Sequence, residues 1–298
     1  MSMKVYLDPL KRHDFVFAFD VKDGNPNGDP DAGNLPRVDP ETMQGLVTDG
    51  CLKRKVRDWV NLTRETEDRM KIYVEHRGIL NKQHERAYTA LGKKSTGTKQ
   101  DRDTINEARE WMCANFFDVR AFGAVMTTGV NCGQVQGPLQ LTFARSVDPI
   151  IPLDLSITRV AVTRPEDAEV SEEGEGGKVT EMGRKAIVPY GLYVGYGFFS
   201  PFFAKDTGMN AEDLAVFWEA LQHMWEIDRS ASRGFMSCRG LYVFTHGKAV
   251  GNAPAHELFE RVNIKRIPDT PPRQFNDYQV KVNESNLPEG VTLTRLVG

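Results

Sequence analysis

The sequence predicts an α+β fold, and three patterns along the chain support it. Residues 13–21 carry large apolar side chains on both alternating faces, as expected for a strand inside a sheet. Residues 190–199 also alternate as a strand, and three glycines on one face predict close approach of another backbone or a helix. Residues 211–227 place apolar side chains at helical spacing after Asn210, a favourable N-cap.

Composition and charge fit an ordinary globular protein. The chain has 298 residues, 40% hydrophobic and 27% charged, enough to bury a sizeable core. Its four cysteines stand far apart without a Cys-x-x-Cys pair, so neither a zinc ribbon nor a disulfide framework is predicted. No apolar segment follows Met1, and no run approaches the ~18 apolar residues of a membrane span, so we expect a cytoplasmic protein. With a net charge of −3, any nucleic-acid site must be a local basic patch.

A glycine-studded stretch at 118–147 is the centre of the predicted organisation. Its first part interleaves four glycines with polar side chains, among them Arg120, Gln134 and Gln136, and a strand is predicted from Leu139. Glycines let backbone amides approach a ligand closely, and amide and guanidinium donors suit phosphate and sugar oxygens. The alternative is a long surface loop whose glycines only form turns.

A long polar loop at 22–48 follows the first strand. Within it, residues 23–34 nearly match the calcium loop of an EF-hand, with oxygen-bearing side chains at alternate positions and Gly28 at the sixth. The twelfth position is Asn34 instead of a bidentate Glu, prolines stiffen the loop, and a strand precedes it where a helix is required. We therefore predict no metal ion here and assign the aspartates and asparagines to Asx turns.

The first helix is predicted to begin at Asp49, its N-cap. Lys53, Arg54 and Arg57 fall within one arc beside its buried stripe. Three cations near the N-terminus of a helix that follows a polar loop form a phosphate-binding arrangement. The alternative is a solvated basic face paired with Asp58.

The remaining segments complete the predicted order. They are a short strand at 71–75, an irregular polar insertion at 76–100, a helix after a capping box at Thr104, a strand at 139–147, a protruding hairpin at 151–189 with an acidic tip, a strand at 241–245, and an extended tail from 251 with strand segments at 279–282 and 292–296.

This order of strands and helices is that of an elaborated RNA-recognition-motif, or ferredoxin-like, core with insertions. We expect one unit over 1–298, with its core at about 10–75, 101–150 and 190–250. The fold hosts many functions. The Arg/Lys-Gly-Phe signature of RNA-binding sheets is absent, so contact with a single strand through loops and basic helices is expected.

Three segments, taken in order, resemble a known family. They are the run 49–57 after the polar loop, the element 118–123 leading to Gly137-Pro-Leu-Gln, and Ser230-Ala-Ser-Arg-Gly. Over roughly 10–245 the chain resembles the CRISPR-associated backbone proteins of Cascade surveillance complexes, with subtype I-C as the nearest match. The resemblance implies a hand-shaped RNA-recognition-motif protein with an inserted finger subdomain at 76–100 and a thumb β-hairpin at 151–189.

The resemblance also implies partners. Several copies of such a protein stack as a helical filament along one CRISPR RNA (crRNA) and present this guide for pairing with target DNA. The other partners are a guide-end-capping subunit, large and small Cascade subunits, and a recruited helicase-nuclease that performs cleavage. The implied subunit is not an enzyme and needs no cofactor.

The resemblance assigns RNA contacts residue by residue. The acidic stretch 166–175 would repel a phosphate backbone, so the thumb tip is expected to face solvent or a protein neighbour. The residues expected to contact RNA are Lys53, Arg54, Arg57, Arg120, Phe122, Gln134, Gln136, Met182, Arg184, Arg233 and Arg239.

Two other classes of function stay open. Backbone subunits of type III complexes cut target RNA with an aspartate in the loop after the first strand, and metal-assisted cleavage needs only one or two such carboxylates. Capping of turns within the loop would equally explain the aspartates of this chain. The third class, a nucleotide-binding metabolic protein, lacks a Gly-x-Gly-x-x-Gly or Walker pattern at the start of a helix. The candidate aspartates are Asp20, Asp23, Asp29, Asp31 and Asp39.

Overall fold

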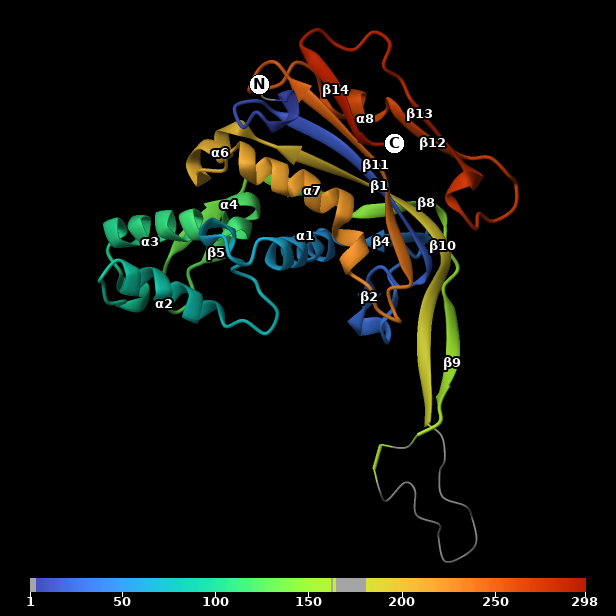
Figure 1. The fold of residues 1–298 in the computed structure, drawn as a ribbon, viewed down its shortest axis with the longest axis horizontal. Coiled ribbons are helices and arrows are strands. Elements are labelled where there is room, and N and C mark those ends of the chain that lie inside the picture. Colours follow the sequence, from blue (N-terminus) through green and yellow to red (C-terminus); the bar gives the residue numbers. More distant parts are fainter. Residues whose placement is uncertain (1–3, 162, 165–180) are drawn as a thin grey trace, which may run out of the picture.

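The computed structural model describes residues 4–161, 163–164 and 181–298, and its centre is an antiparallel β-sheet (Figure 1). In this part of the chain the sheet has eight strands, six of them in the order β14-β11-β1-β10-β8-β4, while β7 and β9 also pair with β10. The strands are β1 (His13–Gly24), β4 (Gln44–Val47), β7 (Leu139–Leu141), β8 (Ala144–Pro149), β9 (Leu153–Arg159), β10 (Glu181–Phe199), β11 (Phe235–His246) and β14 (Val291–Val297). The predicted central strand is confirmed, since β1 lies between β10 and β11.

One face of the sheet is covered by two helices, α1 (Asp49–Thr63) and α7 (Ala211–Ile227) (Figure 1). The apolar side of α7 packs on the phenylalanines of β1, with the ring centroids of Trp225 and Phe19 4.2 Å apart and those of Trp218 and Phe15 4.9 Å apart. These side chains have almost no exposed surface. Their burial stabilises the packing of α7 on the sheet.

The glycines of β10 face rings of the neighbouring strand. Gly195 and Gly197 lie opposite Phe17 and Phe15 of β1. A Cβ atom added at these positions would lie 2.3 Å from Cζ of Phe17 and 2.0 Å from Cζ of Phe15. The expectation that another backbone or a helix approaches Gly195 and Gly197 is therefore wrong, because phenyl rings occupy the space that the missing side chains leave.

The opposite face of the sheet is covered by the C-terminal segment. Helix α8 (Ala255–Phe259) and strands β12 (Val262–Arg266) and β13 (Tyr278–Val282) cover this face, and Leu258 and Tyr278 are buried in its apolar clusters. The strands predicted at 279–282 and 292–296 are confirmed as β13 and β14. The tail is more ordered than its proline content predicts, because it buries the second apolar face of the sheet.

A helical lobe projects from the sheet on the side of α1 (Figure 1). It has its own apolar cluster, built around Tyr73, Tyr88 and Met112. Two expectations are wrong here: 71–75 forms only an isolated bridge at Lys71, and the insertion predicted as irregular contains a helix. The elements of the lobe are α2 (Leu80–Ala90), α3 (Arg102–Asn115), α4 (Phe117–Phe122), β5 (Gly123–Met126) and β6 (Gly133–Gln136), with α6 (Pro201–Thr207) beside them.

Local signals predicted helix positions better than helix ends. The N-cap of α1 is Thr48 instead of Asp49, and that of α3 is Asp101 instead of Thr104, whose amide donates to the Asp101 carboxylate at 2.8 Å. The predicted N-cap of α7 at Asn210 is confirmed, and Asn210 forms a capping box with Asp213. The single strand predicted at 139–147 is two strands, β7 and β8.

A two-stranded ribbon extends away from the sheet (Figure 1). It consists of β9 and the first part of β10, which pair antiparallel from Arg159 opposite Glu181 to Leu153 opposite Ile187. The predicted hairpin strands are thus present, and β10 continues without a break into the central sheet. The predicted acidic tip lies outside the described residues. Among the described helices none is both long and apolar enough to cross a bilayer.

Candidate nucleic-acid interface

The N-terminal half of α1 presents the predicted cations. Lys53 donates to Asp49 across one helical turn at 3.0 Å. Arg54 lies 3.7 Å from Asp58 and 3.2 Å from Nδ1 of His76, and its side chain remains 53% exposed. Burial raises the pKa of Asp58, and the adjacent Arg54 partly offsets this shift. The solvated pair with Asp58 is therefore present, but it leaves about half of the Arg54 side chain exposed.

Arg57 is held in place by a buried carboxylate. Its Nε donates to Asp118 at 2.7 Å, and the same carboxylate accepts from the amides of Tyr73 at 2.7 Å and Val74 at 3.0 Å. The guanidinium lies 5.5 Å from the Phe122 ring centre, and Lys53 approaches the same ring at 5.7 Å. The fold thus gathers Lys53, Arg57 and Phe122 at one place, where the ring faces stabilise the cations.

Arg120 is in the interior, which corrects its predicted role. Its side chain has no exposed surface, and its Nε donates to Asp213 at 3.0 Å while Nη1 donates to the carbonyl of Cys113 at 2.7 Å. Asp213 belongs to the capping box of α7. Arg120 therefore joins α4 to the N-terminus of α7, and it cannot contact an RNA phosphate in this structure. A buried charge needs such a partner, because it has lost its hydration.

Gln134 and Gln136 are exposed on β6, as a site role requires. They line a hollow of about 620 Å³ that also includes Phe122, Gln140 and Arg109. Phe122 therefore connects the cations of α1 to a surface rich in amide side chains. Gly123, with φ +78°, permits this arrangement, since a Cβ there would lie 2.4 Å from the carbonyl of Val135.

Arg233 lies at the end of β1, away from the lobe. It donates to the carbonyls of Asn25 at 3.2 Å and Pro26 at 3.1 Å, and its Nε is 3.5 Å from Asp228. Gly24 packs so closely there that a Cβ would lie 2.0 Å from the carbonyl of Arg233. The loop after α7 and the polar loop after β1 thus form one surface.

Arg239 lies apart from that surface. Its Nε is 2.8 Å from Asp20, and its guanidinium stands 5.1 Å from the ring of Phe275 in the C-terminal segment. Burial raises the pKa of Asp20, and the charge of Arg239 opposes this shift. The structure therefore does not bring Arg239 together with the cations of α1.

Lys55 was not predicted as part of the site. Its side chain is 3% exposed, forms an ion pair with Asp228, and lies 5.7 Å from the ring of Trp225. Asp228 therefore joins Lys55 to Arg233. The signal for this role was in the sequence, since Lys55 stands between Leu52 and Val56 on the buried stripe of the helix.

The polar loop after β1 folds through its own side chains. Asp29 accepts from the amide of Asp31 at 3.2 Å and lies 3.4 Å from Arg37, while Asp39 accepts from Arg145 at 2.7 Å. The pairing with Arg145 lowers the pKa of Asp39. The predicted Asx chemistry is confirmed at Asp29 and Asp39, and the loop contains the short strands β2 (Gly28–Asp29) and β3 (Leu35–Pro36). Within the described ranges, no group of three or more His, Cys, Asp and Glu side chains is placed to hold a metal ion.

Met182 and Arg184 are on the protruding ribbon. Met182 is 81% exposed, and Arg184 pairs with Asp154 of the facing strand. A hollow of about 310 Å³ at the base of the ribbon is lined by Arg184, Lys185, Asn25 and Asn34. The ribbon and the polar loop therefore line one polar hollow together.

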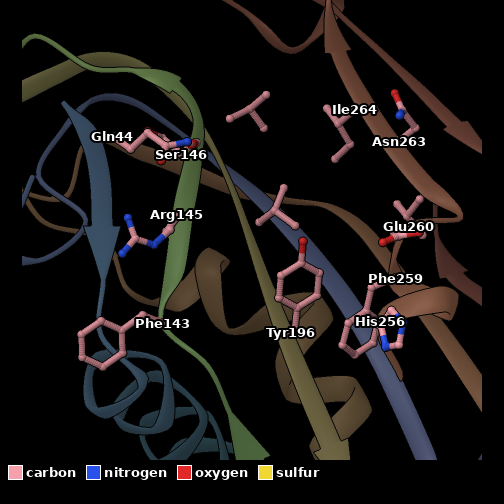
Figure 2. Close-up of a pocket in the computed structure, with 13 residues that line it drawn as sticks. Gln44, Phe143, Arg145, Ser146, Tyr196, His256, Phe259, Glu260, Asn263 and Ile264 are labelled. Carbon is pink, nitrogen blue, oxygen red and sulfur yellow. The ribbon is translucent and has the colours of Figure 1, made fainter. Parts of the chain in front are cut away.

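A separate hollow of about 740 Å³ lies between β8 and β10 and the C-terminal segment (Figure 2). Tyr196 and Phe259 stack there with ring centres 4.6 Å apart, and Phe143 lies nearby. None of the residues predicted for RNA contact lines this hollow. It is therefore distinct from the surface around α1 and β6.

The fold and the surface around α1 and β6 define a mixed α and β protein with a central antiparallel sheet and a basic helix beside exposed amides. Residues 11–283 match the model of the family described as CRISPR-associated protein Cas7, and the chain belongs to that family. A relative from Haloferax volcanii, CRISPR-associated protein Cas7, is 28% identical over 241 residues, which are 72% of this chain. The chain spans about 65% of the length of that relative.

Two solved structures resemble this chain. One, titled CRISPR RNA-guided surveillance complex, pre-nicking, has a TM-score of 0.50 and 16% identity, with 78% of each chain covered. Another, titled CRISPR RNA-guided surveillance complex, has a TM-score of 0.42 and 14% identity over 78% of this chain and 68% of its own. At this identity the first likeness concerns the fold.

Proposed function

We propose that this chain is a guide-binding backbone subunit of a type I-C CRISPR Cascade complex, several copies of which bind one crRNA. The observation that carries this proposal is the cluster of Lys53, Arg57 and Phe122 beside the exposed amides of Gln134 and Gln136, in a chain of the Cas7 family. Cations and amide donors on one surface suit the phosphates and sugars of a single strand.

The paired cations keep donors for phosphate. Arg57 uses Nε for Asp118, its side chain is 14% exposed, and its outer guanidinium nitrogens donate to no other group among the described residues. Lys53 uses one donor for Asp49, and Arg54 is half exposed. The carboxylates hold these cations in place, and the RNA supplies the remaining negative charge. Arg233 and the exposed Arg184 extend the same path towards the ribbon.

The core is proposed to be RNA-recognition-motif-like. Its elements follow the order β1, α1, β8, β10, α7, β11, with the strands arranged β11-β1-β10-β8 and both helices on one face. The helical lobe around α2 would be the finger subdomain, and the β9–β10 ribbon would be the thumb that presses between bases with Met182. Since the C-terminal segment covers the other face of the sheet, RNA is expected on loops and helices instead of sheet aromatics.

The proposed role involves target DNA and further subunits. The bound guide would pair with target DNA, and other copies of this chain, a guide-end-capping subunit, and large and small subunits would complete the complex. A recruited helicase-nuclease would cut the DNA. Such a role needs no catalytic residue in this chain, and Asp20, Asp29 and Asp39 already serve as partners of arginines.

The second candidate function is metal-dependent RNA cleavage by loop aspartates. The observation that favours it is that Asp23, at the end of β1, and Asp31, in the polar loop after β1, have no ion-pair partner among the described residues. It is tested below through substitution of these residues.

The proposal is tested on the purified full chain. The ratio of absorbance at the nucleic-acid and protein maxima, followed by sizing of the extracted nucleic acid, should reveal co-purifying RNA of discrete length. Protein free of RNA that also fails to bind added guide RNA would contradict the proposal.

A further inference from the structure

The segment 77–100 has a charge balance unlike that of the whole chain. It contains six Lys and Arg residues and a single acid, Glu85, whereas the formal net charge of the protein is −3. The segment forms α2 and most of its connection to α3, and this connection is the outer end of the helical lobe (Figure 1). A local positive field therefore exists at the end of the molecule farthest from the ribbon.

The cations of the lobe differ from those of α1 in their partners. Lys53, Arg54 and Arg57 each have a carboxylate within 4.0 Å. Among the described residues, only Lys93 of the six in 77–100 has such a partner, Glu107 at 2.6 Å. Six exposed cations at or next to this segment have no carboxylate within ion-pair distance among the described residues: Arg77, Lys82, Arg86, Lys94, Lys99 and Arg102. Unpaired like charges gathered on one lobe repel each other until an external anion neutralises them.

A groove leads from these cations towards the guide surface, which is the surface of Lys53, Arg57, Phe122, Gln134 and Gln136 that is proposed to bind the guide. A hollow of about 600 Å³ is lined by Gln100, Arg102, Arg109 and Gln134. It shares Arg109 and Gln134 with the hollow beside Phe122. Guanidinium and amide donors thus continue from the end of the lobe to the surface proposed for the guide.

Aromatic residues decide which form of nucleic acid suits the lobe. Surfaces for single strands combine cations with exposed aromatic rings on which bases stack. In 77–102 Tyr88 is the only Phe, Tyr or Trp, and it is buried with its hydroxyl donating to the carbonyl of Asn131. The described part of 77–102 can therefore bind phosphates, but it presents no exposed aromatic ring on which unstacked bases could stack.

We propose that the lobe around α2 and the start of α3 is a second nucleic-acid surface, which holds the phosphate backbone of a duplex independently of its sequence. This inference rests on the proposed function only in assigning the single-stranded guide to the other surface. The chemistry is shared by DNA and RNA duplexes, and the test below separates them.

The test uses the full chain loaded with guide RNA and a fluorescent DNA duplex that does not match the guide. A variant with Lys82, Lys94, Lys99 and Arg102 changed to Ala removes four unpaired cations. A matched control changes Lys205, Lys248, Lys265 and Lys281 to Ala, which removes the same charge from exposed positions outside the lobe. An RNA duplex and a single-stranded DNA of equal length are the comparison ligands.

We expect the lobe variant to bind the DNA duplex at least about tenfold more weakly at low salt, with a log–log salt slope reduced by about 3 to 4. The control and a Lys82→Arg, Lys94→Arg, Lys99→Arg variant should bind as the wild type does, and the lobe variant should retain its affinity for guide RNA. If the RNA duplex binds as well as the DNA duplex, the surface recognises duplex phosphates in general.

Three results would overturn the inference: unchanged duplex affinity in the lobe variant, an equal loss in the control, or tighter binding of the single strand than of either duplex. A parallel loss of guide affinity would also overturn it, because the lobe would then belong to the guide surface. Failure of the wild type to bind guide RNA, with duplex binding intact, would instead refute the proposed function alone.

Discussion

Arg54 and Arg57 are three residues apart on α1, yet their surroundings give them different roles. Arg54 is half exposed, and its partner Asp58 is on the surface. Arg57 is paired with Asp118, which has no exposed surface and also orders the backbone at Tyr73. Such a surface pair contributes little to stability, whereas loss of one partner of a buried pair leaves an uncompensated charge.

Arg54 and its neighbour Lys53 are therefore the cleaner probe of guide binding, because neither is paired with a fully buried carboxylate. We expect Lys53→Ala with Arg54→Ala to weaken guide binding to a similar degree for all guide sequences, and to reduce the salt slope by about 1.4 for two lost phosphate contacts on a single strand. Fluorescence titration at several salt concentrations measures both effects. Loss of affinity for some guides but not others would mean that these residues read bases.

Arg57 and Arg120 are expected to act on stability. Arg57→Ala should lower the free energy of unfolding by about 3 to 5 kcal/mol, because Asp118 is left buried and unpaired. Arg120→Ala should do the same through Asp213. Urea denaturation measures the cost, and Lys205→Ala is the surface control. A stable Arg120→Ala variant with weakened RNA binding would return this residue to the interface.

At the scale of elements, the period of the apolar residues predicted β1, α1, α7 and β11, because each buries a continuous face in one core. Whether a polar residue is buried or exposed was harder to predict, since this depends on contacts with residues distant in sequence. Arg120 and Asp213 are 93 residues apart, so nothing near Arg120 marked it as buried. The helix α2 was missed because its buried positions include Gln83 and His84, which weaken the apolar pattern.

The strand β1 contains a buried histidine that predicts a pH effect. Nε2 of His13 donates to the carbonyl of Asp8 at 2.9 Å, and Nδ1 lies 2.9 Å from the hydroxyl of Thr245, which can donate to a neutral ring. Burial lowers the pKa of His13 from 6.5 to about 4. Between pH 6.5 and about 4, the unfolded chain therefore binds a proton that the folded chain does not. The stability that depends on neutral His13 is present above pH 6.5 and is lost as the pH falls to about 4.

The corresponding change in the free energy of unfolding is about 3 kcal/mol. Urea titrations at pH 7 and pH 4.5 should show a larger fall for the wild type than for His13→Gln, which keeps a donor and an acceptor but does not titrate. Equal falls in the two proteins would show that His13 is already protonated in the folded state.

The loop after β1 carries the prediction on catalysis. Guide-loaded protein should leave a matched single-stranded RNA whole in Mg²⁺ or Mn²⁺, because Asp29 and Asp39 of this loop already serve as turn and ion-pair partners. Gel electrophoresis of labelled target measures this. Cleavage at regular spacing that disappears in Asp23→Ala, Asp29→Ala or Asp31→Ala would establish the chain as a nuclease, since a contaminant has no such spacing.

At the scale of the whole molecule, the two ends of the protein have different surfaces. The ribbon bears exposed apolar side chains at Leu155, Ile157 and Met182, while the helical lobe is basic. Different surfaces at the two ends suit head-to-tail stacking, which gives an open filament when the rotation between copies does not close. The guide surface of α1 lies between these ends (Figure 1).

The central claim is that copies of this chain assemble along a guide RNA. The most direct measurement is the mass of complexes formed on single-stranded RNAs of increasing length, with single-stranded DNA of equal lengths as the comparison. The account predicts that the mass rises in steps of one protomer as the RNA lengthens, each step requiring the same number of added nucleotides. One protomer bound whatever the RNA length, or no complex on RNA, would contradict it.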